Sequence, residues 1–236
     1  GQEPSPALAR PLSFSGLVTA SENEIRSEDI SISYGDTKGT GNVVVSNFKD
    51  QNPVKLQANM GFKGVLNFDQ IAPKADKSKQ ASVEEKVAKG QKLSSPAFLP
   101  ESLSLPFPLE AKLKIVAEGI QMGGVVYKGV SADIVKTGSD IDFTAAMSDI
   151  PGKTNLDIRG LLRYATASRS GDKGITYADP KLTFAVNGTS QQFPTLLRSF
   201  APDQDDNKAL EIYKPARFDV QGMVGQDKIS FNSSPV

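Results

Sequence analysis

Acidic residues are the side chains in this sequence with the clearest potential for chemistry. Asp140 and Asp142 lie two positions apart, with Asp149 nearby, and paired carboxylates serve as acid and base in glycoside hydrolysis. Residues two apart on a strand share one face, but no aromatic platform for a sugar accompanies this pair on that face. The pattern does not favour catalysis, although a carbohydrate-binding or hydrolytic β domain stays open as an alternative.

Two other motifs fail on spacing. The acidic run at 203–207 resembles the start of a calcium loop, yet the positions that require Gly and Glu hold Lys208 and Lys214. The glycines within 35–41 are not followed by the Gly-Lys-Ser/Thr of a phosphate-binding loop, and their surroundings indicate a hairpin. We therefore expect no enzyme activity, no metal site and no cofactor.

Composition excludes further classes of function. The 236 residues contain 27 Lys and Arg, 27 Asp and Glu, and no Cys, His or Trp. A net charge of zero argues against nucleic-acid binding, which depends on basic side chains. The missing Cys and His remove disulfides, thiolate nucleophiles and the commonest metal ligands and general base. No apolar run approaches the roughly 20 residues that span a bilayer.

The carboxylates lie within a longer pattern that dominates residues 108–162. Apolar residues occupy every second position in four consecutive runs, which predicts four strands with one apolar and one polar side each. The alternating residues are Leu113, Ile115 and Ala117; Val130, Ala132 and Ile134; Ile141, Phe143, Ala145 and Met147; and Leu156 and Ile158. The pattern predicts a mainly β protein, a long curved antiparallel sheet with an apolar groove. A closed β-sandwich is the alternative, because alternating strands also build closed cores.

The rest of the chain continues the β pattern around one polar interruption. We predict a linker at 1–10, a single elongated β domain over 11–236, a polar Lys/Glu-rich insertion at 72–105, and a polar hairpin loop at 163–173. A proline near the start of 193–200 predicts a short helix there. Leu12–Val18 also matches Phe218–Val224 in pattern, so a partial next repeat begins at 215, as in an open-ended array.

These features resemble the AsmA family of Gram-negative envelope proteins. The residues that carry the resemblance are Leu12–Val18, Asp29–Gly41, Pro108–Leu113, Gly123–Val130 and Leu156–Gly160. The resemblance covers about four fifths of the chain and rests on the succession of strands, turns and glycines. It implies a long bent sheet with an apolar trough, tethered to the inner membrane through a segment outside this sequence.

The resemblance also implies a function. Such proteins act in the periplasm as bridges that carry phospholipid in outer-membrane biogenesis, so the expected partners are lipid and other envelope proteins. The side chains predicted to line the trough are apolar residues from four regions: Leu56, Met60, Phe62, Leu113, Ile115, Ile141, Phe143, Leu182 and Phe184. A structural or protein-interaction β-sandwich without a ligand is the alternative.

Overall fold

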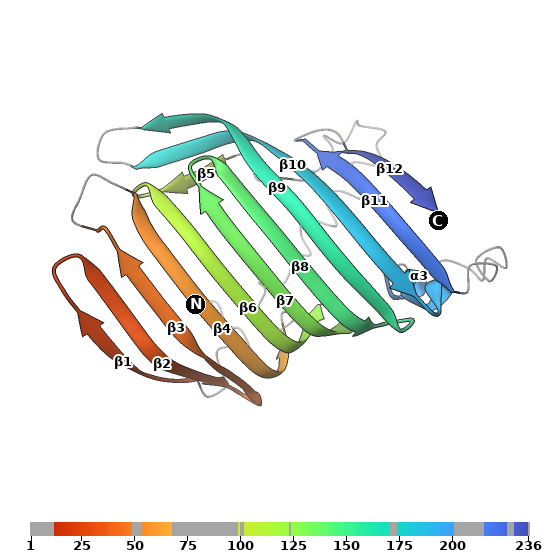
Figure 1. Ribbon diagram of the computed structural model, residues 1–236, viewed down its shortest axis with the longest axis horizontal. Helices are drawn as coiled ribbons and strands as arrows, with labels where there is room; N and C mark the ends of the chain where they lie inside the picture. Colours follow the sequence, from red (N-terminus) through yellow and green to blue (C-terminus); the bar gives the residue numbers. More distant parts are fainter. Residues whose placement is uncertain are drawn as a thin grey trace, which may run out of the picture.

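The computed structural model is one large, open, curved sheet with one short helix (Figure 1). It describes residues 12–48, 53–67, 99, 102–122, 124–169, 174–200, 215–225 and 229–235. The predicted linker at 1–10, the acidic run at 203–207 and most of the insertion at 72–105 lie outside these residues. The described elements are β1 (Leu12–Ala20), β2 (Glu24–Tyr34), β3 (Thr37–Ser46), β4 (Val54–Asn67), β5 (Ser102–Leu105), β6 (Leu109–Met122), β7 (Val125–Thr137), β8 (Asp140–Ile150), β9 (Thr154–Arg169), β10 (Ile175–Ser190), α3 (Phe193–Phe200), β11 (Ala216–Val224) and β12 (Ile229–Pro235).

The strands follow one another across the sheet in nearly sequential order. The order is β1-β2-β3-β4-β6-β7-β8-β9-β10-β11-β12, and β5 pairs separately with β10. Since β1 and β12 form opposite edges, the sheet is not closed, and the alternative of a closed sandwich is wrong. The four strands predicted within 108–162 are confirmed as β6 to β9.

The sheet is mixed, which corrects the prediction of a purely antiparallel one. β4 and β6 are parallel, with Ala58 opposite Leu113, whereas the other neighbouring pairs are antiparallel. A parallel pair requires a crossover connection long enough to return the chain to the starting end of its neighbour. The connection between Asn67 and Leu109 provides that length, and β5 within it pairs with β10.

Bulges bend the strands at four places. The register shifts around Asp29, Gly64, Gly129 and Asp149, and each of these residues has a positive φ, between 54° and 84°. A bulge bends its strand and increases the local twist. The curvature of the sheet is therefore built into β2, β4, β7 and β8.

Two local predictions have different outcomes. The short helix at 193–200 is confirmed as α3. The polar loop predicted at 163–173 is wrong in its first part, because β9 continues to Arg169 and pairs with β10 as far as Ile175. The prediction failed because polar residues interrupt the apolar alternation in this part of β9. Only Tyr164 among residues 163–165 is buried, although the backbone pairing with β10 continues.

Candidate apolar binding face

All nine residues predicted to line a trough lie on the same side of the sheet, which we call the apolar face. The register places Leu113, Phe143 and Phe184 in one row that also contains Ala58, Ile134 and Gly160. The neighbouring rows contain the others: Leu56, Ile141 and Leu182 in one, and Met60 and Ile115 in the next, with Phe62 two positions farther along β4. Each of the nine is half-buried, and the described strands form no second sheet over them.

Aromatic rings lie across glycines of the neighbouring strand on this face. Phe143 lies over Gly160, and a methyl group added at Gly160 would overlap the phenyl ring. The same arrangement pairs rings with glycines at three other places: Phe62 with Gly39, Phe184 with Gly222, and Phe218 with Gly188. A ring over a glycine covers backbone that would otherwise be exposed. These four aromatic side chains therefore lie directly against the backbone of the sheet.

One end of the apolar face is closed by α3. Leu196 is 3% exposed and belongs to a core cluster with Ile150 and Leu156. Phe193 of the same helix packs against Phe218 of β11, with ring centroids 5.4 Å apart. Figure 1 shows α3 beside the ends of β10 and β11. This helix therefore forms an apolar stop at that end of the strands.

Buried hydroxyl groups hold α3 in place. Thr154 Oγ1 is 2.7 Å from Ser190 Oγ and 2.9 Å from the carbonyl oxygen of Pro151. Ser190 Oγ donates in turn to the carbonyl oxygen of Gly152, which also accepts the backbone N–H of Gln192. The network ties the β8–β9 turn to the residues that begin α3.

The opposite end carries a lysine and two tyrosines. Lys136 Nζ lies 4.5 Å from the centroid of the Tyr177 ring, whose centroid is 6.0 Å from that of Tyr164. In a flat sheet Tyr177 would lie three strands and five residues away from Lys136, about 20 Å. The contact shows that the paired ends of β9 and β10 bend back over this end, and Figure 1 shows both strands curving there. Sequence reasoning missed Lys136, although it occupies the next apolar-face position after Ile134.

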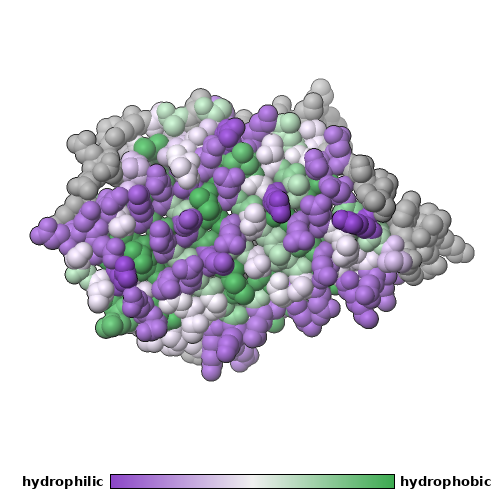
Figure 2. Space-filling view, in the orientation of Figure 1, coloured by the Kyte–Doolittle hydropathy of each residue, from purple (hydrophilic) through white to green (hydrophobic). Residues whose placement is uncertain are grey.

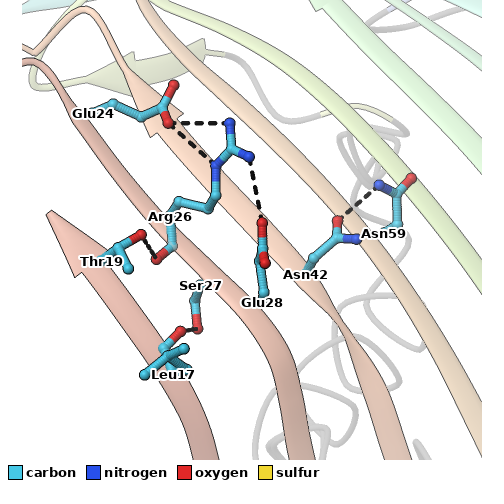
Figure 3. A network of polar contacts seen from close by, with 8 residues as sticks. All are labelled: Leu17, Thr19, Glu24, Arg26, Ser27, Glu28, Asn42 and Asn59. Carbon is cyan, nitrogen blue, oxygen red and sulfur yellow. Dashed lines mark hydrogen bonds and ion pairs between the residues drawn. The ribbon is translucent and has the colours of Figure 1, made fainter. Parts of the chain in front are cut away.

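The other side of the sheet, the polar face, carries many charged side chains. Arg26 bridges Glu24 and Glu28, and Asn59 donates to Asn42 at 2.9 Å (Figure 3). The view in Figure 2 is mostly hydrophilic, with small hydrophobic areas between the hydrophilic residues. This surface differs in kind from the apolar face, as the alternation predicts.

Shallow hollows lie on the polar face, and sequence reasoning did not identify them. One of about 490 Å³ is lined by Val135, Leu161, Asp133, Asp142, Arg159 and others. A more polar one of about 750 Å³ is lined by Arg26, Glu28, Asn42, Gln57 and others. The signal in the sequence is weak: Val135 and Leu161 are apolar residues at positions where the alternation expects polar ones.

Asp140 and Asp142 have distinct surroundings. Arg163 grips Asp140 with two nitrogens, the closer contact being 2.8 Å, and this hydrogen bonding lowers the pKa of Asp140. A carboxyl group held ionised is a poor general acid. Asp142 lines the smaller hollow instead. Among the described residues, no group of three or more potential ligands is arranged to hold a metal ion.

No protein-family model, curated protein or solved structure matches the chain. In the part of the chain that the structure describes, no helix is long and apolar enough to cross a membrane. The arrangement of side chains is therefore the basis for the functional proposal.

Proposed function

We propose that this chain is the periplasmic portion of an AsmA-like protein and binds phospholipid acyl chains on its apolar face. In this proposal it serves lipid transport in outer-membrane biogenesis and is tethered to the inner membrane through a segment outside this sequence. The observation that carries the proposal is the common placement of nine half-buried apolar side chains on one face of an open sheet. Large apolar surfaces without a packed partner mark binding sites in soluble proteins.

The dimensions suit an acyl chain. A row from Leu113 on β6 to Phe184 on β10 crosses four strand spacings, or about 19 Å at 4.8 Å each. One lipid tail is about 15 Å long, half of the hydrocarbon core of a bilayer. Each buried CH₂ contributes about 0.8 kcal/mol, so half-covering a tail of about 14 CH₂ groups yields roughly 5–6 kcal/mol. Binding costs of several kcal/mol then leave a reversible interaction, as a transport function requires.

Lipid uptake by matched variants tests the proposal. Ile134→Asn places an amide on the apolar face, whereas Val135→Asn makes the same kind of change one residue later on the polar face. Both side chains are half-buried, so the two substitutions are made at positions of similar exposure. We expect Ile134→Asn to reduce uptake of a fluorescent phospholipid severalfold and Val135→Asn to leave it nearly unchanged.

Three outcomes oppose the proposal. The first is that the wild-type protein, shown to be folded by circular dichroism, has no co-purified phospholipid in native mass spectrometry and takes up none from vesicles. The second is that Val135→Asn alone abolishes uptake, which would assign the lipid to the hollow on the polar face. Equal losses in both variants would mean that unfolding, and not the apolar face, controls uptake.

Protein interaction through β1 is the second candidate function. Phe14, Leu17 and Val18 on this edge strand are 63%, 67% and 57% exposed, and β1 contains neither charges nor proline. Edge strands are ordinarily protected by such residues against pairing with another chain. Analytical ultracentrifugation of wild type and Val18→Lys tests this candidate: a mass that falls on substitution supports pairing through β1, and a monomer in both cases opposes self-association there.

A further inference from the structure

Lys136 interrupts the apolar face with a positive charge. The register places it in a row with Leu56, Ala111, Ile141 and Leu182. Within this row and the two rows beside it, across β4 and β6 to β10, Lys136 is the one charged side chain among the described residues. A strand that alternates through Val130, Ala132 and Ile134 is expected to continue with another apolar residue, so the lysine stands out.

Lys136 is buried at this end of the apolar face. The residue is 7% exposed, and Nζ donates to the carbonyl oxygen of Gly138 at 2.6 Å. No described carboxylate lies within ion-pair distance. Burial lowers the pKa of Lys136, and the negative charge of Glu110 opposes this effect by raising it. Buried charges in proteins are normally paired, and an ammonium group has three N–H donors, one of which the carbonyl oxygen of Gly138 accepts.

Aromatic side chains from the bent β9–β10 hairpin surround this position. The Tyr177 ring faces the ammonium, and Tyr164, which is 5% exposed, packs beside it. A ring face attracts a cation but supplies no full negative charge, so it orients the ammonium without neutralising it. The position therefore combines a fixed cation with apolar walls.

The distance from Lys136 to α3 matches an acyl chain. Along β8 the apolar face extends from Ile141, the neighbour of Lys136, to Met147 near the core cluster of Leu196. Six residues of strand span about 20 Å, slightly more than the roughly 15 Å of one lipid tail. An amphiphile with its head at Lys136 would place its tail along the apolar face and its end near α3.

We propose that Lys136 binds the acidic head group of an amphiphile, a carboxylate or phosphate, whose chain lies on the apolar face. This inference rests on the proposed function and specifies its ligand as an anionic lipid, bound with its head at the β9–β10 end. A structural role, in which Lys136 only packs against Tyr177, is the competing explanation. Binding of a free anion without a chain is another, because inorganic phosphate offers the same chemistry.

The test compares ligands that share a chain and differ in charge. Palmitate and hexadecanol are titrated against the folded protein at neutral pH, with inorganic phosphate as the anion without a chain. We expect wild type to bind palmitate about tenfold more tightly than hexadecanol, the scale of one charge-assisted hydrogen bond. Lys136→Met should remove this preference while keeping hexadecanol affinity, and Lys136→Arg should keep it. Lys112→Met, on the polar face opposite Val135, is the matched control and should retain the preference.

Each outcome decides between the explanations. Equal binding of palmitate and hexadecanol by wild type overturns the inference and leaves the proposed function intact. Failure to bind either ligand contradicts the proposed function itself. Phosphate binding that depends on Lys136, without preference for the long chain, also overturns the inference. If Lys136→Met does not fold, the wild-type comparison and Lys136→Arg still give the answer.

Discussion

The contact between Phe143 and Gly160 provides a direct test of how the apolar face is built. In the variant Gly160→Ala, the new methyl group would lie 2.5 Å from Phe143 Cε1 and 3.0 Å from Cε2, so the ring must rotate away. Forcing a ring from its preferred position and overpacking a site together cost about 1–3 kcal/mol. For a protein of this size, that corresponds to a fall in Tm of roughly 2–10 °C.

Thermal melting followed by circular dichroism measures the effect, and Gly61→Ala is the matched control. A methyl group at Gly61 would meet only the carbonyl oxygen of Thr40, at 3.9 Å, so we expect little change in Tm. Phe143→Leu in the Gly160→Ala background should restore part of the loss, because the smaller side chain vacates the position. Equal Tm values for the two glycine variants would refute the reasoning that the rings lie directly on the glycines.

Three further predictions concern stability. Thr154→Val removes a buried hydroxyl group from the network beside α3, so we expect a loss of about 1–3 kcal/mol by urea unfolding, whereas exposed Thr183→Val should lose little. Leu196→Ala empties a buried position and should cost about 2–5 kcal/mol in the same assay; no loss would contradict the packing of α3. Arg163 holds the pKa of Asp140 below its unfolded value, so their interaction stabilises the fold above the unfolded pKa and is lost as the pH falls through the folded pKa. Asp140→Asn should therefore weaken the decline of Tm in the acid range below about pH 4, and an unchanged acid profile would oppose this assignment.

Alternation was a sound guide to which side chains share a face. The nine lining residues come from four strands, and the bulges do not disturb their shared placement, since no bulged residue lies between two of them on the same strand. Side-chain period in a strand is a local property, so it is readable in the sequence without knowledge of the strand's partners.

Features that depend on distant parts of the chain were not predictable in the same way. The parallel pairing of β4 with β6 follows from a long connection, and the extension of β9 through Arg163 depends on pairing with β10. Lys136 illustrates the same limit. Its polar side chain suggested no special role, because its burial arises only when the β9–β10 hairpin bends over it.

The position of a bound lipid is the measurement that tests the proposed function most directly. A photo-crosslinking amino acid is placed at Ile115 on the apolar face or at Val116 on the polar face, and the folded proteins are irradiated with phospholipid vesicles. Val116 is 50% exposed, more than half-buried Ile115, so exposure alone would favour crosslinking at Val116. We expect lipid adducts chiefly at position 115; adducts chiefly at position 116, or at neither position, would contradict the proposed function.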